Sequence, residues 1–108
     1  MPRTTARRTM DAELSEKDWQ QQIINCAEQN GWLIYRTFDS RRSPYGFPDL
    51  VLVKPPRVLF WECKTEDEKK SKPSPEQETW IRKLKLCRAV YADIVRPRHW
   101  DQVEAALR

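Results

Sequence analysis

Two acidic residues and a lysine, Asp49, Glu62 and Lys64, have the residue types and the spacing to support hydrolysis. Carboxylates joined by a backbone carbonyl, here that of Cys63, form the oxygen shell that Mg²⁺ or Mn²⁺ prefers. A metal ion held in this way polarises a phosphoryl oxygen and lowers the pKa of a bound water, which a neighbouring lysine can orient or deprotonate. The pattern predicts phosphodiester hydrolysis. The alternative is a turn acid beside a surface ion pair worth about 0 to 1 kcal/mol.

The spacing of these residues predicts a strand hairpin that brings them together. Asp49 opens the first of two short apolar runs, 49–54 and 58–64, and Glu62 and Lys64 close the second. Both runs are too short for helices, and prolines separate them, which is typical of an antiparallel hairpin. Side chains alternate along a strand, so Glu62 and Lys64 share one face, and the hairpin sets Asp49 beside them.

A helix and a strand precede this hairpin. Ser15 and Asp18 form a capping signal, apolar residues then recur at helical spacing, and Gly31 is a C-terminal stop. These signals predict a helix over 16–30. Residues 32–38 are rich in aromatic and β-branched types and predict a strand.

A helix, a strand and a last helix follow the hairpin. Ser74-Pro75-Glu76-Gln77 combines an N-cap, a proline at the first helical position and a glutamine three residues after the cap. Residues 89–95 predict a strand, and a final helix is predicted from His99 onward. The predicted fold is an α/β domain with the order α-β-β-β-α-β-α and a mixed four-stranded sheet flanked by helices.

Composition limits the chain to one domain and to few kinds of chemistry. Its 108 residues are 39% hydrophobic, enough for one core. His99 is the only histidine, and no glycine-rich phosphate cradle occurs, so neither histidine-based catalysis nor a nucleotide cofactor is expected. The three cysteines lack C-x-x-C spacing and are expected to be free thiols. No apolar run approaches the ~18 residues of a membrane span, and no signal peptide is evident, so we expect a cytoplasmic protein without membrane contact.

The net charge of +4 is unevenly distributed. The first ten residues contain three arginines and no acid, so residues 1–13 are predicted to be a basic, flexible arm, and residues 14–108 a single folded domain. Further basic clusters indicate a polyanionic partner, with solvated surface charge as the alternative. They include Arg41-Arg42 and the group formed by Lys69, Lys70 and Lys72.

Short motifs spread from about Leu14 to Leu107 occur together in the order of a known nuclease family. They are Ser15-Glu16-Lys17-Asp18, Gly31-Trp32, Asp39-Ser40-Arg41-Arg42-Ser43, Gly46-Phe47-Pro48-Asp49-Leu50, Glu62-Cys63-Lys64, Ser74-Pro75-Glu76-Gln77 and Trp80. In combination they resemble the PD-(D/E)XK nuclease superfamily and, within it, the virus-type replication-repair nucleases, VRR-NUC. The sequence departs from the family pattern at Cys63, where leucine is common, and at Arg36, which replaces a frequent histidine.

The resemblance implies a restriction-endonuclease-like core and a set of site residues. The implied catalytic residues are Asp49, Glu62, Lys64, Glu16 and Gln77, and the implied metal ligands are Asp49, Glu62 and the backbone carbonyl of Cys63. Two of these assignments have alternatives. Glu16 can be an ordinary first-turn acid, and Glu13, one turn away, or Glu28, on the same helix, can complete the site in its place. Gln77 can serve only as the capping residue.

The loop before Asp49 and the charged stretch after Lys64 are expected to contact DNA. Arg41 and Arg42 lie in the loop that leads to Asp49, which favours contacts with phosphate over solvated surface charge. The expected DNA-binding residues are Ser40, Arg41, Arg42, Ser43, Lys69, Lys70 and Lys72.

The resemblance also implies an activity and an assembly. It predicts a Mg²⁺-dependent DNA endonuclease, with Mn²⁺ able to substitute, that acts as a homodimer on four-way (Holliday) junctions in a bacterial or phage-infected cell. Two alternatives remain open. One is a nickase, flap or restriction-like nuclease with the same site, and the other is a catalytically idle DNA-binding module.

Overall fold

The computed structural model describes residues 4–37 and 44–108. Its elements are α1 (Thr5–Glu13), α2 (Glu16–Gln29), β1 (Leu33–Arg36), β2 (Leu50–Lys54), β3 (Arg57–Cys63), α3 (Pro75–Lys85), β4 (Tyr91–Val95), the 3₁₀ turn η1 (Pro97–His99) and α4 (Trp100–Leu107). The predicted order α-β-β-β-α-β-α is confirmed from α2 onward. None of the helices in the described ranges is long and apolar enough to cross a membrane.

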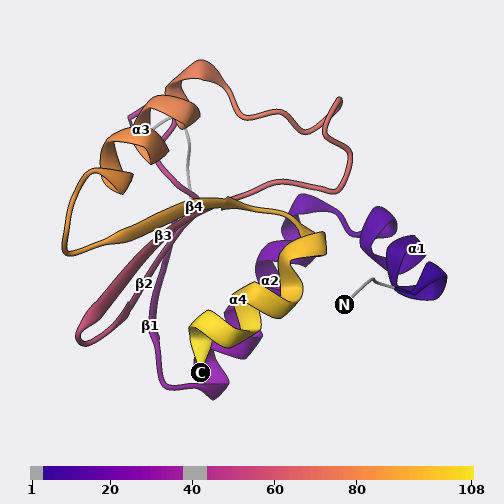
Figure 1. Ribbon diagram of the computed structural model, residues 1–108, viewed down its shortest axis with the longest axis horizontal. Coiled ribbons are helices and arrows are strands. Elements are labelled where there is room, and N and C mark those ends of the chain that lie inside the picture. The colour runs from indigo at the N-terminus through magenta and orange to yellow at the C-terminus, as the bar shows by residue number, and fades with distance from the viewer. Residues whose placement is uncertain (1–3, 38–43) are drawn as a thin grey trace.

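The four strands form one mixed sheet in the order β1-β2-β3-β4 (Figure 1). β1, β2 and β3 pair antiparallel, and β4 pairs parallel to β3. The connection from β3 to β4 runs through α3, because two neighbouring parallel strands must be joined by a crossover connection. Both the predicted hairpin and the α/β fold with a mixed sheet are confirmed.

Helices cover both faces of the sheet. In Figure 1, α3 lies on one side of the sheet, and α2 and α4 lie on the other. The main core forms between the sheet and the pair α2 and α4, where Trp19 from α2 and Leu107 from α4 are fully buried. The indole nitrogens of Trp19 and Trp32 donate hydrogen bonds to the backbone oxygens of Val95, at 3.0 Å, and Leu107, at 2.8 Å. These bonds satisfy the polar group of each buried ring.

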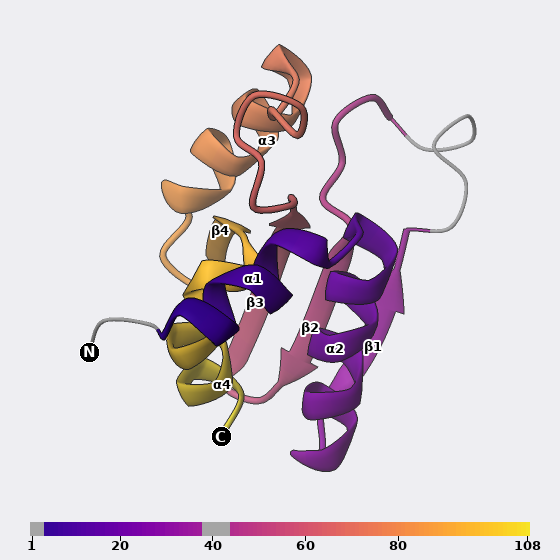
Figure 2. The same ribbon diagram turned by 90° about the vertical axis from the view of Figure 1, so that its right-hand side faces the viewer.

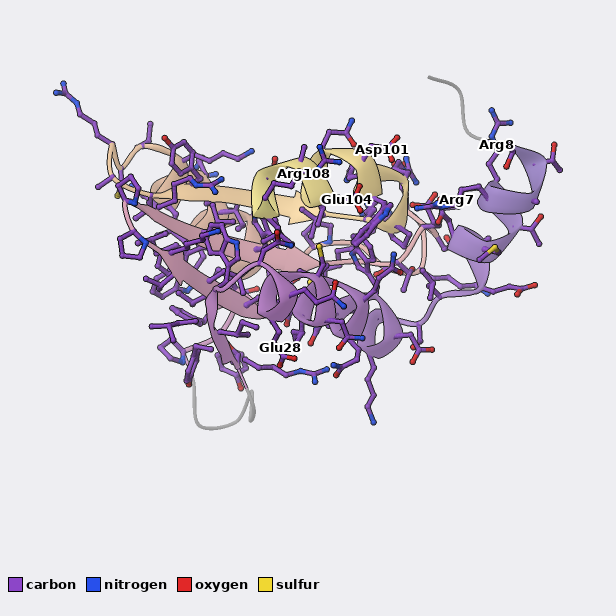
Figure 3. The ribbon with its side chains drawn as sticks, turned by 90° about the horizontal axis from the view of Figure 1, so that it is seen from below. Arg7, Arg8, Glu28, Asp101, Glu104 and Arg108 are labelled. Carbon is purple, nitrogen blue, oxygen red and sulfur yellow. The ribbon has the colours of Figure 1, made fainter. Side chains whose placement is uncertain are left out.

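The first helix corrects a sequence expectation. Residues 5–13, expected within a flexible arm, form α1, whose N-cap Thr4 accepts a hydrogen bond from the Arg7 backbone at 3.1 Å. Asp11 on this helix is buried and lies 3.5 Å from the Arg7 side chain. Figure 3 shows Arg7 and Arg8 on α1 at one end of the molecule. The helix lacks an apolar stripe, which is why hydrophobic periodicity does not reveal it.

Local signals set the start of α3 and the end of α2. Ser74 Oγ accepts from the Gln77 backbone at 3.1 Å, and Gln77 Oε1 accepts from the Ser74 backbone at 2.8 Å, so the predicted capping box is present. Gly31, just past α2, has a φ of +81°, a conformation that glycine adopts without steric cost.

Candidate active site

The start of β2 lies beside the end of β3 (Figure 2). The structure brings Asp49, Glu62 and Lys64 together at this place. Leu50 pairs with Trp61 in the β2–β3 ladder, so Asp49 lies opposite Glu62. Asp49 Oδ2 accepts a hydrogen bond from the Cys63 backbone nitrogen at 2.9 Å. The hairpin therefore sets the two carboxylates side by side, as the spacing predicted.

Strand alternation separates these groups from the core. Cys63 is fully buried within the core cluster, whereas Glu62 and Lys64 project from the opposite side of β3. Lys64 Nζ lies 3.9 Å from Glu62 Oε2. The residues are only 1% and 7% exposed, so the alternative of a surface ion pair is wrong.

The carboxylate of Glu62 is buried without adequate compensation. Within the described part of the chain, neither of its oxygens receives a hydrogen bond. Burial raises the pKa of Glu62 to about 9, the neighbouring Asp49 carboxyl and the charge of Glu16 act in the same direction, and Lys64 opposes them. A buried acid of this kind destabilises the metal-free fold, which is typical of a functional group and not of a structural one.

The donor set around Glu62 fits a hard cation. A divalent ion would satisfy the two orphaned oxygens of Glu62 and offset the repulsion from Asp49. Among the described residues, no three His, Cys, Asp or Glu side chains gather as a metal site. The chain would therefore supply Asp49, Glu62 and the Cys63 carbonyl, and water would complete the shell, as Mg²⁺ prefers.

The raised pKa of Glu62 predicts how stability depends on pH in the absence of metal. Its folded pKa of about 9 lies above the ordinary value of 4.5, so its contribution to stability is fully present below that ordinary value and is lost as pH rises toward the folded pKa. Glu62→Gln does not titrate. In EDTA, its unfolding temperature is expected to exceed that of the wild type by an amount that grows between about pH 5 and pH 9. Thermal unfolding measured across this range tests the prediction, and parallel curves for the two proteins would contradict it.

Glu16, in the first turn of α2, is an acid whose charge acts on Glu62. Its Oε2 accepts a hydrogen bond from Ser71 Oγ at 3.4 Å. Glu28, labelled in Figure 3, lies at the opposite end of α2, about 18 Å along the helix from Glu16 at 1.5 Å per residue. Of these two acids, Glu16 is the one whose position supports a role in the site.

Gln77 forms the capping box at the start of α3. Its carbonyl oxygen is engaged with the Ser74 backbone, so the capping interpretation is confirmed. Among the described interactions, Gln77 has no contact with Asp49 or Glu62 that would support its implied catalytic role.

The segment before Asp49 packs tightly against α3. Gly46 has a φ of +85°, and a Cβ there would lie 2.4 Å from the backbone carbon of Glu76. The Trp80 indole donates to the Tyr45 backbone oxygen at 3.1 Å, and the rings of Phe47 and Trp80 meet edge to face at 5.1 Å. These contacts fix the approach of the chain to Asp49.

Replacement of Gly46 by alanine is expected to disturb both stability and the site. The left-handed backbone costs an L-residue roughly 1 to 2 kcal/mol, and the clash with Glu76 adds to this cost. Gly31→Ala is a matched control, because Gly31 also has a positive φ but has no atom within 4 Å of its Cβ position. Chemical denaturation should show a larger loss of unfolding free energy for Gly46→Ala than for Gly31→Ala. Equal losses would mean that the close approach has no energetic role.

The predicted DNA-binding residues fall into two groups. Ser40, Arg41, Arg42 and Ser43 lie outside the described residues. Lys69, Lys70 and Lys72 are exposed on the loop after Lys64. The backbone nitrogens of Lys69 and Lys70 donate to Asp67 Oδ1 at 3.0 and 3.1 Å, so these two contacts engage the backbone and not the ammonium groups.

Ser71 is a residue near the site that the sequence analysis missed. It is buried between Glu16 and the chain that follows Lys64. No local pattern marks it, because it is a single serine within a charged stretch.

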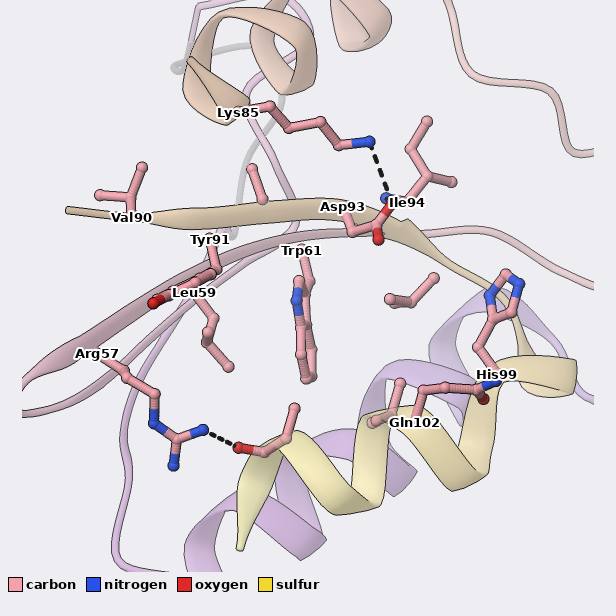
Figure 4. A pocket seen from close by; sticks show the side chains of 14 residues that line it. Arg57, Leu59, Trp61, Lys85, Val90, Tyr91, Asp93, Ile94, His99 and Gln102 are labelled. Carbon is pink, nitrogen blue, oxygen red and sulfur yellow. Dashed lines mark hydrogen bonds and ion pairs between the residues drawn. The ribbon is translucent and has the colours of Figure 1, made fainter. Parts of the chain in front are cut away.

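A cavity of about 750 Å³ lies away from these residues, between β4 and α4 (Figure 4). Its floor contains Trp61, and two intramolecular contacts lie at its margin. Lys85 Nζ and Asp93 Oδ1 are 3.6 Å apart, and Arg57 donates to the Ala106 backbone oxygen. None of the predicted catalytic residues is among the described residues that line it.

Comparison with known proteins gives one family. The model of the VRR-NUC domain matches residues 2–93, a range that contains Glu16, Asp49, Glu62 and Lys64. Comparisons with curated proteins and with solved structures found no significant match. The match covers most of the chain and agrees with the α/β fold described above. The chain therefore belongs to the VRR-NUC family.

Proposed function

We propose that this chain is a metal-dependent endonuclease that hydrolyses phosphodiester bonds in DNA. Its family membership makes it a nuclease-type, DNA-processing domain. The observation that carries the finer proposal is the Glu62 carboxylate, which is buried beside Asp49 and has no hydrogen-bond donor among the described residues. A site that retains such a destabilising group is suited to hold a cation.

Each residue has a proposed role in this site. Asp49, Glu62 and the Cys63 carbonyl would hold Mg²⁺ or Mn²⁺. The bound ion would polarise the scissile phosphate and lower the pKa of a water molecule. Lys64, whose Nζ lies 3.9 Å from Glu62 Oε2, would orient the attacking water as an ammonium group or, in the neutral amine form, take up its proton.

The direct test is cleavage of labelled DNA by the purified protein. Four-way junction, flap, splayed-arm and duplex substrates would each be incubated with Mg²⁺, with Mn²⁺ and with EDTA. We expect cleavage with either ion and none in EDTA. Binding without cleavage under all ion conditions would favour the idle DNA-binding module.

DNA contacts are proposed on either side of the site in the sequence. The candidates are Ser40, Arg41, Arg42, Ser43, Lys69, Lys70 and Lys72. The exposed lysines support this proposal, because they lie on the loop between β3, which ends next to Lys64, and α3. Phosphate contacts of this kind position DNA without reading its sequence.

A homodimer acting on four-way junctions is the proposed assembly. Two-fold symmetry would present two sites for paired cuts. Leu33 and Tyr35 support a contact surface, because they are 73% and 58% exposed on the face of edge strand β1 that points away from the core. Val53 and Val51 lie beside them across the ladder, which extends this apolar surface. A monomeric nickase or a flap nuclease remains the alternative.

Tyr35→Lys is expected to weaken the proposed dimer about tenfold or more, because it places a charge in an apolar contact. Tyr91→Lys is a matched control, since Tyr91 is 59% exposed, close to the 58% of Tyr35, but lies on the opposite edge strand. Sedimentation equilibrium should show a dimer for the wild type and for the control, and a monomer for Tyr35→Lys at the same concentration. A monomeric wild type that still cleaves DNA would favour the nickase or flap-nuclease alternative.

A further inference from the structure

Ser71 connects two parts of the site that are far apart in the sequence. Its side chain is 8% exposed, with Oγ accepting a hydrogen bond from the Thr65 backbone nitrogen at 3.0 Å. The same Oγ donates to Glu16 Oε2 at 3.4 Å. Thr65 directly follows Lys64, and Glu16 begins α2. One hydroxyl therefore joins the chain that follows Glu62 and Lys64 to Glu16 at the start of α2.

The turn that carries Ser71 is closed by its own backbone. The Ser71 nitrogen donates to the Asp67 backbone oxygen at 2.8 Å. Asp67 Oδ1 accepts from the backbone nitrogens of Lys69 and Lys70. These two hydrogen bonds lower the pKa of Asp67, because they stabilise its ionised form.

Arg98 holds this turn from the C-terminal part of the chain. Its backbone nitrogen donates to Glu66 Oε1 at 2.6 Å, and its Nη2 donates to the Glu66 backbone oxygen at 2.9 Å. Its Nη1 reaches Glu68 Oε1 at 2.7 Å. Arg96, which is buried, donates from Nη1 to the Thr65 backbone oxygen. The segment over 65–71 is thus fixed at several points, which makes Ser71 a preorganised donor.

We propose that Ser71 is a positioning residue that holds the Glu16 carboxylate where its charge adds to the cation site of Asp49 and Glu62. The inference rests on the proposed function and deepens it. Ser71 acts through Glu16 and has no direct contact with the reacting groups. The buried hydroxyl is consistent with this role, because both its donor and its acceptor capacity are used between Thr65 and Glu16. Partners that orient the acids of a metal site contribute to affinity in this way.

The test is Mg²⁺ affinity measured by calorimetry, with cleavage as a second readout. The valine side chain of Ser71→Val and the threonine side chain of Ser71→Thr have the same shape, so a comparison of the two variants separates the effect of the hydroxyl from any change in packing. We expect Ser71→Val to weaken Mg²⁺ binding about tenfold, the lower end of the range for such partners, and Ser71→Thr to bind more tightly than Ser71→Val. At subsaturating Mg²⁺, cleavage by Ser71→Val should fall by a similar factor with KM for DNA unchanged.

The route through Glu16 is tested by a double-mutant cycle. In a Glu16→Gln background, Ser71→Val should cause no further loss of Mg²⁺ affinity. Ser74→Ala is the control for a merely structural serine, because its Oγ caps α3 and should affect unfolding temperature but not Mg²⁺ affinity. Equal Mg²⁺ affinity in Ser71→Val and Ser71→Thr would overturn the inference, as would an undiminished effect in the Glu16→Gln background or a wild type that binds no Mg²⁺. If the wild type and its variants show the expected differences in Mg²⁺ affinity but the wild type cleaves no DNA, the proposed function alone would be overturned.

Discussion

Asp49→Asn and Glu62→Gln are each expected to reduce DNA cleavage about a thousandfold or more. Lewis-acid stabilisation is worth several kcal/mol, and each 1.4 kcal/mol corresponds to a factor of ten in rate. Both replacements remove a charged ligand and nearly preserve shape. The amide oxygen introduced by Asp49→Asn can still accept from the Cys63 backbone nitrogen, a contact of 2.9 Å in the wild type, so folding should survive.

Single-turnover cleavage, DNA binding and thermal unfolding would be measured on the same preparations. DNA binding should persist or tighten, because the repulsion between the carboxylates and phosphate falls. Glu28→Gln is a suitable control, since Glu28 is an exposed acid in the last turn of α2, and it should cleave like the wild type. Cleavage retained by both site variants would contradict the assignment of Asp49 and Glu62 as metal ligands.

Lys64→Ala is expected to reduce the cleavage rate by about 10² to 10⁴, the range for a single general acid or base. Metal binding should be largely retained. Loss of the ammonium group removes a charge that favours the ionised form of Glu62, but it also removes repulsion toward the incoming cation. These two effects on metal affinity oppose each other.

Calorimetry and single-turnover kinetics separate catalysis from charge pairing. If Lys64→Ala loses metal affinity together with activity, Lys64 is a charge partner of the acids and not a catalyst. Lys64→Arg is an informative second variant, because it retains the positive charge and changes the geometry of the donor. It should retain metal binding without restoring the wild-type rate.

Local sequence signals correctly predicted the elements that carry the site. Strand alternation put Glu62 and Lys64 on one face and Cys63 in the core, and the hairpin set Asp49 opposite Glu62. Ser74 and Gln77 marked the start of α3 through a capping box. These features depend on residues within a few positions of one another or on strands joined by a short turn, so the chain itself specifies them.

Helix α1 shows the limit of such signals. The segment Thr5–Glu13 is polar and basic, a composition that predicts part of an arm. Asp11 on this helix is buried, which is a result of tertiary packing that no hydrophobic pattern predicts. The prediction failed there because tertiary packing can stabilise a helix that lacks an apolar stripe.

The sequence by itself determined which residue types stand at the site and which strand face they share, because side-chain alternation is a property of the local backbone. Only the tertiary structure decided that Glu62 and Lys64 are buried, that Gly46 lies against the backbone of Glu76, and that Ser71 reaches Glu16 across 55 positions of sequence. Burial and long-range contact depend on how separate elements pack. That packing turned an acid with an ordinary pKa into the uncompensated carboxylate of the candidate metal site.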